Sequence, residues 1–196
     1  VIFRGPFSEE SIPQCSLPEF IFRQPEPFGQ KPALIEGQTG RVLTYEELAD
    51  ASRRFAAGLA EQGFNKGDVF AIITPNVPEF ATAFYGVSLL GGANTMINPL
   101  YTVVEMAAQL ADCGARFALT IPERIAVVQD AASRAGVERV FVIGNSPGNS
   151  AFSDLLSTSG NVPDVEIKPG EDLVALPYSS GTTGRAKGVM LTHRNV

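Results

Sequence analysis

The stretch Val69-Phe70-Ala71-Ile72-Ile73-Thr74-Pro75-Asn76-Val77-Pro78 predicts a buried β-strand that leads directly into a helix. An unbroken apolar run is typical of a strand that is covered on both faces, as strands in parallel sheets are. Pro78 suits the first turn of a helix, because the N–H that proline lacks has no partner there in any case. We expect a strand over 69–74 and a buried helix, apolar nearly all round, that ends near Leu90.

The same alternation of strands and helices continues on both sides of this stretch. Thr44 and Glu47 have the spacing of a capping box, so a helix is expected from Thr44 to Gly63. Further strands are expected at 93–98, 116–120 and 139–143, and further helices at 102 onward, 123–134 and 152–156. Because parallel strands need crossover connections, the series predicts an α/β fold, a mainly parallel sheet with helices on both faces.

The chain divides into three parts by composition and pattern. Residues 1–43 are rich in proline and form an irregular N-terminal wrap, with a hairpin that joins 33–36 to 41–43. Residues 44–170 form an alternating β/α subdomain. Residues 171–196 contain two strands, the loop between them and the start of a truncated helix at Thr192, so we interpret the chain as an N-terminal fragment.

The loop Ser179-Ser180-Gly181-Thr182-Thr183-Gly184-Arg185-Ala186-Lys187-Gly188 has the composition of a polyphosphate-binding site. Its glycines let the backbone N–H groups approach anionic oxygens, its hydroxyls add donors, and Lys187 adds a mobile positive charge. Such composition is also common in solvated turns. The setting favours binding, because an expected buried strand at 172–178 leads into the loop and a short strand at 189–191 leaves it.

Two other phosphate-binding motifs are excluded by spacing. In the Walker pattern counted from Gly181, the second glycine falls on Ala186, and Lys187 is followed by Gly188 instead of serine or threonine. The dinucleotide fingerprint G-x-G-x-x-G occurs nowhere in the chain. Neither a P-loop nor a Rossmann-type nicotinamide or flavin site is therefore supported.

The segment from Leu176 to His193 resembles the phosphate loop of the adenylate-forming superfamily, which includes acyl-CoA ligases, luciferases and peptide-synthetase adenylation domains. Within that superfamily, the chain is most similar to 4-coumarate–CoA ligases. The similarity extends to Ile2-Phe3-Arg4, Leu43-Thr44-Tyr45, Pro75 to Phe80, Gly86 to Gly91 and Asn98-Pro99-Leu100. One departure is Ala186, because the family usually has proline before the lysine. We expect a more mobile empty loop but no loss of function.

The resemblance implies that the parent protein joins a carboxylic acid, either 4-coumarate or a related aromatic acid, to ATP and then to coenzyme A, with Mg²⁺. It implies nucleotide binding by Ser179, Ser180, Gly181, Thr182, Thr183, Gly184 and Lys187. Lys187 acts as a phosphate clamp and not as a nucleophile. No catalytic residue or metal ligand is assigned, because the family's acyl pocket, ribose-binding carboxylate and catalytic lysine belong to sequence beyond Val196. We therefore expect the isolated chain to be inactive.

Composition indicates an ordinary globular protein with a small-molecule partner. The chain of 196 residues is 44% hydrophobic and 18% charged, with a net charge of -6 and a pI near 4.8, which argues against nucleic-acid binding. Cys15 and Cys113 are too few and too far apart to suggest a disulfide framework or a zinc site. We expect a cytoplasmic protein without a membrane span.

Three alternatives stay open on the sequence alone. The parent could act on medium- or long-chain fatty acids, the chain could be a non-catalytic nucleotide-binding or interaction module, or it could be a structural fragment without a ligand. His193, the only histidine, is more typical of local packing or helix capping than of catalysis. The uncovered C-terminal edge suggests self-association.

Overall fold

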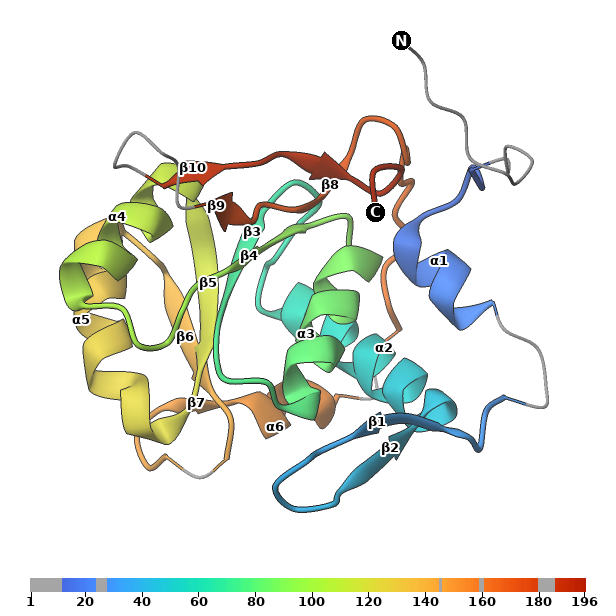
Figure 1. The fold of residues 1–196 in the computed structure, drawn as a ribbon, viewed down its shortest axis with the longest axis horizontal. Helices are drawn as coiled ribbons and strands as arrows, with labels where there is room; N and C mark the ends of the chain where they lie inside the picture. Colours follow the sequence, from blue (N-terminus) through green and yellow to red (C-terminus); the bar gives the residue numbers. More distant parts are fainter. Residues whose placement is uncertain (1–11, 24–27, 145, 159–160, 180–185) are drawn as a thin grey trace, which may run out of the picture.

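The structure, a computed structural model, describes residues 12–23, 28–144, 146–158, 161–179 and 186–196. Its centre is a seven-stranded sheet (Figure 1). The strands of this sheet are β3 (Val69–Ile73), β4 (Ala93–Met96), β5 (Ala115–Thr120), β6 (Arg139–Val142), β7 (Ser150–Ala151), β8 (Leu173–Ala175) and β11 (Leu191–Thr192). They lie in the order β11-β8-β4-β3-β5-β6-β7, and only the β11–β8 pair is antiparallel. The mainly parallel sheet predicted from the sequence is confirmed.

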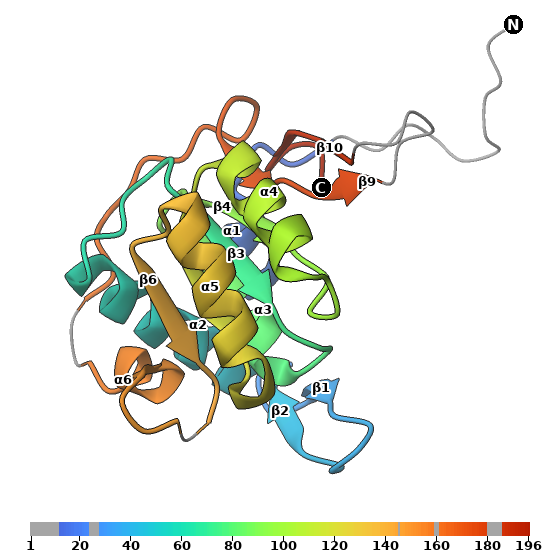
Figure 2. The same cartoon turned by 90° about the vertical axis from the view of Figure 1, so that its left-hand side faces the viewer.

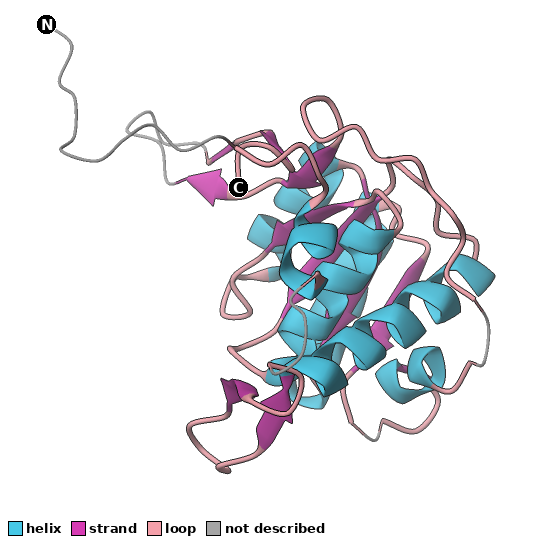
Figure 3. Ribbon diagram, turned by 90° about the vertical axis from the view of Figure 1, so that its right-hand side faces the viewer, coloured by secondary structure: helices cyan, strands magenta, loops and turns pink. Residues whose placement is uncertain are grey.

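Helices cover both faces of this sheet. α2 (Tyr45–Glu61), α3 (Pro78–Leu89) and α6 (Phe152–Leu156) pack on one face, and α4 (Val103–Cys113) and α5 (Ile125–Ala135) pack on the other. Figure 2 shows α4 and α5 in front of the sheet, and Figure 3 shows the molecule from the opposite side. The predicted α/β fold with helices on both faces is confirmed. Among the described residues, no helix is long and apolar enough to cross a membrane.

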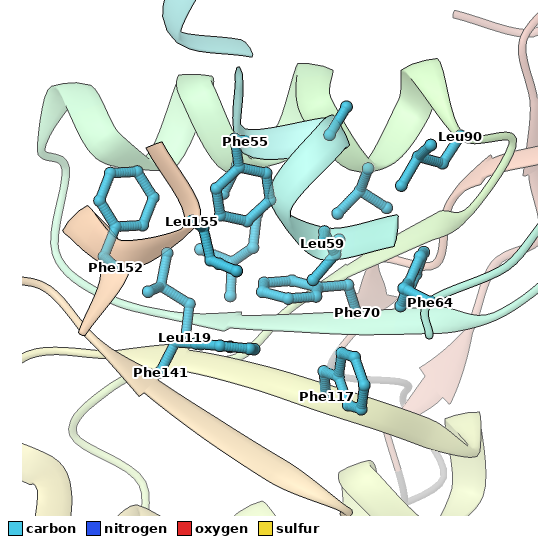
Figure 4. Close-up of a cluster of buried hydrophobic side chains, with 14 residues drawn as sticks. Phe55, Leu59, Phe64, Phe70, Leu90, Phe117, Leu119, Phe141, Phe152 and Leu155 are labelled. Atoms are coloured by element: carbon cyan, nitrogen blue, oxygen red, sulfur yellow. The ribbon is translucent and has the colours of Figure 1, made fainter. Parts of the chain in front are cut away.

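Aromatic rings dominate the core between the sheet and α2, α3 and α6 (Figure 4). The fully buried rings of Phe55 and Phe70 meet edge to face, with their centroids 5.8 Å apart. Phe64 packs against Phe117 on β5, also with a centroid distance of 5.8 Å. Because burial of one such side chain stabilises a fold by about 1.5–3 kcal/mol, these rings fix α2 firmly on the sheet.

Capping boxes start two of the long helices where the sequence predicts them. The Thr44 hydroxyl oxygen accepts from the Glu47 N–H at 3.2 Å, and the Glu47 carboxylate accepts from the Thr44 N–H at 2.8 Å. Thr102 and Glu105 make the same exchange at the start of α4. The pKa of Glu105 is lowered, because the backbone N–H and the hydroxyl of Thr102 both donate to its carboxylate.

The N-terminal part contains the predicted hairpin and one helix that was not predicted. β1 (Pro32–Ile35) and β2 (Val42–Thr44) pair antiparallel, which confirms the hairpin. The unpredicted helix is α1 (Leu17–Phe22). Ser16 caps it by accepting from the Glu19 N–H at 3.3 Å, and a proline lies in the first turn. Ser16 followed three residues later by Glu19 is a capping signal that the sequence analysis passed over.

The predicted strand over 172–178 is broken, and of the predicted strand over 189–191 only Leu191 lies in a strand, β11 (Leu191–Thr192). β8 ends at Ala175, and β9 (Tyr178–Ser179) pairs instead with β10 (Lys187–Gly188) in a separate two-stranded sheet. Proline has no N–H to donate to a ladder, so Pro177 interrupts the first arm. Val189 donates its N–H to the Pro177 carbonyl at 2.8 Å, and the second arm rejoins the main sheet only at β11.

Other departures from the predictions are small. The helix expected from Glu123 begins at Ile125, after a 3-10 turn over Pro122–Arg124. β7 was not predicted, since two residues give no readable periodicity. Beyond Thr192 the described chain forms a turn, in which the Asn195 side-chain oxygen accepts from the N–H and the hydroxyl of Thr192.

α2 and α6 meet at Gly58 without room for a side chain. A Cβ atom at residue 58 would lie 2.2 Å from the carbonyl oxygen of Leu155 and 2.7 Å from its Cα atom. A glycine inside a helix costs about 1 kcal/mol relative to alanine, so packing and not helix propensity explains this residue. Backbone atoms cannot rotate away as a flexible side chain can.

Replacing Gly58 by alanine is expected to destabilise the fold by about 2 kcal/mol, because overpacking against the α6 backbone outweighs the gain in helix propensity. Urea unfolding followed by circular dichroism measures the change. Gly37→Ala is the control, because a Cβ atom there meets nothing within 4 Å. A Gly58→Ala protein as stable as the wild type would contradict the close contact between α2 and α6.

Candidate functional site

A hairpin carries the residues that the sequence assigns to phosphate binding. Its arms, β9 and β10, pair antiparallel with Lys187 opposite Ser179. Both side chains are exposed. The remaining predicted residues lie outside the described residues: Ser180, Gly181, Thr182, Thr183 and Gly184. The structure therefore places a lysine and a serine side by side at the base of the loop.

The hairpin leaves the main sheet at the carboxyl end of β8, where α/β folds commonly bind ligands. Figures 1 and 2 show β9 and β10 beside α4, at the end of the domain opposite to the β1–β2 hairpin. In the described part of the chain, β8 pairs with β4 through one residue pair, Ala175 with Asn94. The Leu176 N–H adds a hydrogen bond to the Asn94 carbonyl at 2.7 Å. So short a ladder needs further contacts to hold the strand.

Buried polar side chains supply those contacts. Asn94 is fully buried, and its side-chain amide donates to the carbonyl oxygen of Val174 at 3.2 Å and to a carbonyl of α3 at 3.1 Å. The Thr95 hydroxyl donates to the Leu176 carbonyl at 3.0 Å. It also accepts from the side-chain amide of Gln109 on α4 at 3.2 Å. These side chains tie the strand that carries the loop to both a neighbouring strand and two helices.

This network was not predicted from the sequence. The predicted strand over 93–98 contains Asn94 and Thr95, and their polarity is the signal that points to this network, because buried polar side chains are hydrogen-bonded. Gln109 gave a similar signal on the buried side of α4. Removing one partner of a buried hydrogen bond costs about 1–3 kcal/mol, so these residues help to hold β8 and Leu176 in place.

His193 is a buried packing residue that connects the C-terminal turn to α1. Its side chain is 4% exposed, and its Nδ1 atom accepts from the Leu17 N–H at 3.1 Å. This acceptor role requires the neutral imidazole. Burial lowers the pKa of His193, with Asp172 acting to raise it and Lys66 to lower it. The geometry agrees with the packing role predicted from the sequence.

Lys66 and Asp172 form an ion pair beside His193. The Lys66 Nζ atom lies 2.7 Å from Asp172 Oδ2, which also accepts from the Lys168 N–H at 2.7 Å. Burial acts to raise the pKa of Asp172, but these donors outweigh it, and the pKa is lowered. The pair fixes the residues just before β8, and thus the start of the strand that carries the loop.

The partly buried thiol of Cys113 is weakly reactive. Cys15 and Cys113 are free thiols, and burial raises the pKa of Cys113 above its usual value. A raised pKa keeps the thiol protonated and weakly nucleophilic. Within the described ranges, no group of three or more histidine, cysteine, aspartate or glutamate residues is placed to hold a metal ion.

Comparison with known proteins identifies the family. Residues 21–196 match the family model of the AMP-binding enzymes. The chain belongs to the AMP-binding enzyme family. It is 43% identical over 197 residues to 4-coumarate–CoA ligase 3 of Oryza sativa subsp. japonica and 39% identical over 198 residues to 4-coumarate–CoA ligase 2 of Solanum tuberosum. These alignments cover 100% of this chain but only 35% and 36% of the two ligases.

Solved structures of related enzymes share the fold of this AMP-binding family member. A long-chain-fatty-acid–CoA ligase from Archaeoglobus fulgidus has a TM-score of 0.87 at 28% identity, over 97% of this chain and 39% of that chain. An anthranilate–CoA ligase in complex with anthranoyl-AMP has a TM-score of 0.82 at 25% identity, over 92% and 35% of the two chains. The predicted resemblance to adenylate-forming enzymes is confirmed.

The stability of the fold is expected to decrease as the pH falls below about 6.5, the ordinary pKa of histidine. Because the pKa of His193 is lower in the folded chain, the unfolded chain binds the proton first, and the loss continues until the pH reaches the folded pKa. Urea unfolding at pH 7.5 and 5.5 measures this change in the free energy of unfolding. His193→Asn, which retains an uncharged acceptor, is the comparison, and the stability advantage of the wild type should narrow at pH 5.5. An advantage independent of pH would contradict the buried neutral histidine.

Proposed function

We propose that this chain is the phosphate-binding part of an ATP-dependent, AMP-forming carboxylate–CoA ligase. That enzyme joins a carboxylic acid to the AMP part of ATP with release of pyrophosphate, and the thiol of coenzyme A then displaces AMP to form a thioester. The observation that carries the proposal is the pairing of Lys187 with Ser179 at the base of a glycine-rich loop. Membership of the AMP-binding family supports the reaction class.

The chemistry explains why such a loop is needed. A carboxylate must approach an α-phosphate that already carries negative oxygens, and two unit charges 4 Å apart repel by about 4 kcal/mol at an effective dielectric constant of 20. Cations and N–H donors on the outer phosphates reduce this repulsion and stabilise the leaving pyrophosphate. We assign that task to Ser179, Ser180, Gly181, Thr182, Thr183, Gly184 and Lys187. No catalytic residue is assigned within this chain.

We propose 4-coumarate or a related aromatic acid as the substrate. The 4-coumarate–CoA ligases among the relatives are 37–43% identical to this chain. A medium- or long-chain fatty acid is the alternative, supported by the fatty-acid ligase structure at the lower identity of 28%. The identities favour the aromatic acid.

The remaining parts of the proposal follow from the reaction class. ATP and coenzyme A are the co-substrates, and Mg²⁺ enters only as the counterion of the ATP phosphates, without an assigned residue. We place the ligase in the cytoplasm and expect no turnover by the isolated chain. In the alternative, a non-catalytic nucleotide-binding module, the loop also binds a nucleotide. That alternative differs from this proposal only because the parent protein would not catalyse the ligase reaction.

The chain is expected to bind Mg-ATP in isothermal titration calorimetry, and Lys187→Ala should weaken binding at least about tenfold, because hydrogen bonds to charged groups contribute about 1.5–3 kcal/mol. Lys168→Ala is the matched control. Lys168 is also an exposed lysine, but its side chain lies near Glu171, with 3.7 Å between charged atoms. Equal affinity of the wild type and Lys187→Ala, or no binding by the wild type, would contradict the assignment of the loop.

We also propose that the chain associates with itself through β11. Among the described strands, β11 is at the edge of the main sheet, and Val189 and Met190 just before it are 44% and 69% exposed. Exposed edges next to apolar side chains favour pairing with a second copy. Light scattering at high protein concentration should show dimers, and Met190→Lys should reduce them. A monodisperse wild-type monomer would contradict self-association.

A further inference from the structure

α4 contacts the hairpin that carries Lys187. The hydroxyl of Tyr178, on β9, donates a hydrogen bond to the Oδ2 atom of Asp112 in the last turn of α4. Tyr178 immediately precedes Ser179, which pairs with Lys187. Asp112 is therefore joined to the arm of the hairpin from which the loop begins.

The ring of Tyr178 also contacts the second arm. Gly188 lies opposite Tyr178, and a Cβ atom at residue 188 would be 3.1 Å from Tyr178 Cζ and 3.3 Å from its hydroxyl oxygen. The ring thus lies across the backbone of β10, next to Lys187. The side chain of Tyr178, on the first arm, thus contacts both the second arm and α4.

The phenol remains a hydrogen-bond donor over the physiological pH range. Burial raises the pKa of Tyr178, and the hydrogen bond to Asp112 raises it further. One turn earlier on α4, Gln109 donates to Thr95, whose hydroxyl donates to the Leu176 carbonyl. The same helix therefore contacts the loop strand directly at Tyr178, after Pro177, and indirectly through Thr95 of β4 at Leu176, before Pro177.

We propose that Asp112 and Tyr178 are positioning residues that hold the base of the phosphate loop, so that Lys187 and Ser179 are in place before the nucleotide arrives. This inference rests on the proposed function of the loop. Neither residue needs to contact ATP. A binding segment that is already held in its bound conformation loses less conformational entropy when the ligand binds, and the affinity is therefore higher.

Two variants isolate the hydrogen bond. Tyr178→Phe keeps the ring over Gly188 and removes only the hydroxyl, and Asp112→Ala removes the acceptor. Each should weaken Mg-ATP binding about fivefold, and the double variant should be no weaker than either single one. Asp112→Asn, which retains a side-chain acceptor oxygen, should restore affinity to within about twofold of the wild type. Asp130→Ala, which removes an exposed carboxylate from α5, is the control.

Amide hydrogen exchange tests the same contact without a ligand. The Val189 N–H, which donates to Pro177, should exchange about fivefold faster in Tyr178→Phe and Asp112→Ala. The urea midpoint should stay at the wild-type value, because the contact holds only the hairpin. A general structural role would instead lower the midpoint.

The outcomes separate the two hypotheses. Unchanged Val189 exchange and unchanged ATP affinity in Tyr178→Phe would overturn the positioning role, even if Lys187→Ala loses binding and the proposed function stands. Faster Val189 exchange in a chain that binds no Mg-ATP would support the contact while overturning the proposed function. A lowered urea midpoint in both variants would also overturn the positioning role.

Discussion

The strand that carries the phosphate loop joins the parallel strands of the main sheet through a very short ladder. β8 meets β4 at the single residue pair of Ala175 with Asn94 and through the Leu176 N–H, and on its other side it pairs only with the two-residue strand β11, so few backbone hydrogen bonds fix its position. The side chains of Asn94 and Thr95 add to this short ladder. They donate to the carbonyls of Val174 and Leu176 at 3.2 and 3.0 Å. In a buried setting an unmade hydrogen bond is costly, so each of these bonds selects one position of the strand.

This arrangement depends on β4 being fixed in turn. β4 pairs with β3, whose Phe70 is buried against Phe55 of α2. α2 also meets α6 at Gly58 and α3 at Gly86, two positions without room for a side chain. α2, α3 and α6 are therefore closely packed with each other and with the sheet, and a shift of any of these elements would create a clash or a cavity. β8, the strand that leads toward the loop, is attached to this packed part through β4.

Local signals in the sequence predicted most of the fold. Thr44, Thr102 and Pro78 mark helix starts through contacts within one turn, and the apolar run at β3 marks a strand without reference to the rest of the chain. Pro177 is a local signal for the break after β8, but the pairing of β9 with β10 in a separate sheet could not be predicted in this way, because it depends on which strands the two arms find as partners. The role of Asn94 is non-local for the same reason, since its partner Val174 lies 80 residues away.

The same distinction bears on Ala186, which stands where the family pattern has proline. A proline in a compatible position stabilises a segment by about 0.4–1 kcal/mol, because it restricts the unordered chain. The hydrogen bond from Tyr178 to Asp112 is of comparable size, since solvent screening at the exposed Asp112 reduces a charged hydrogen bond to about 1 kcal/mol. The conformational restriction that a proline at residue 186 would give is absent here. The hydrogen bond at the base of the hairpin can offset a free-energy loss of that size. On the proposed positioning role, the contact between Tyr178 and α4 would thus act at the base of the hairpin in the way that a proline before Lys187 would act next to the loop.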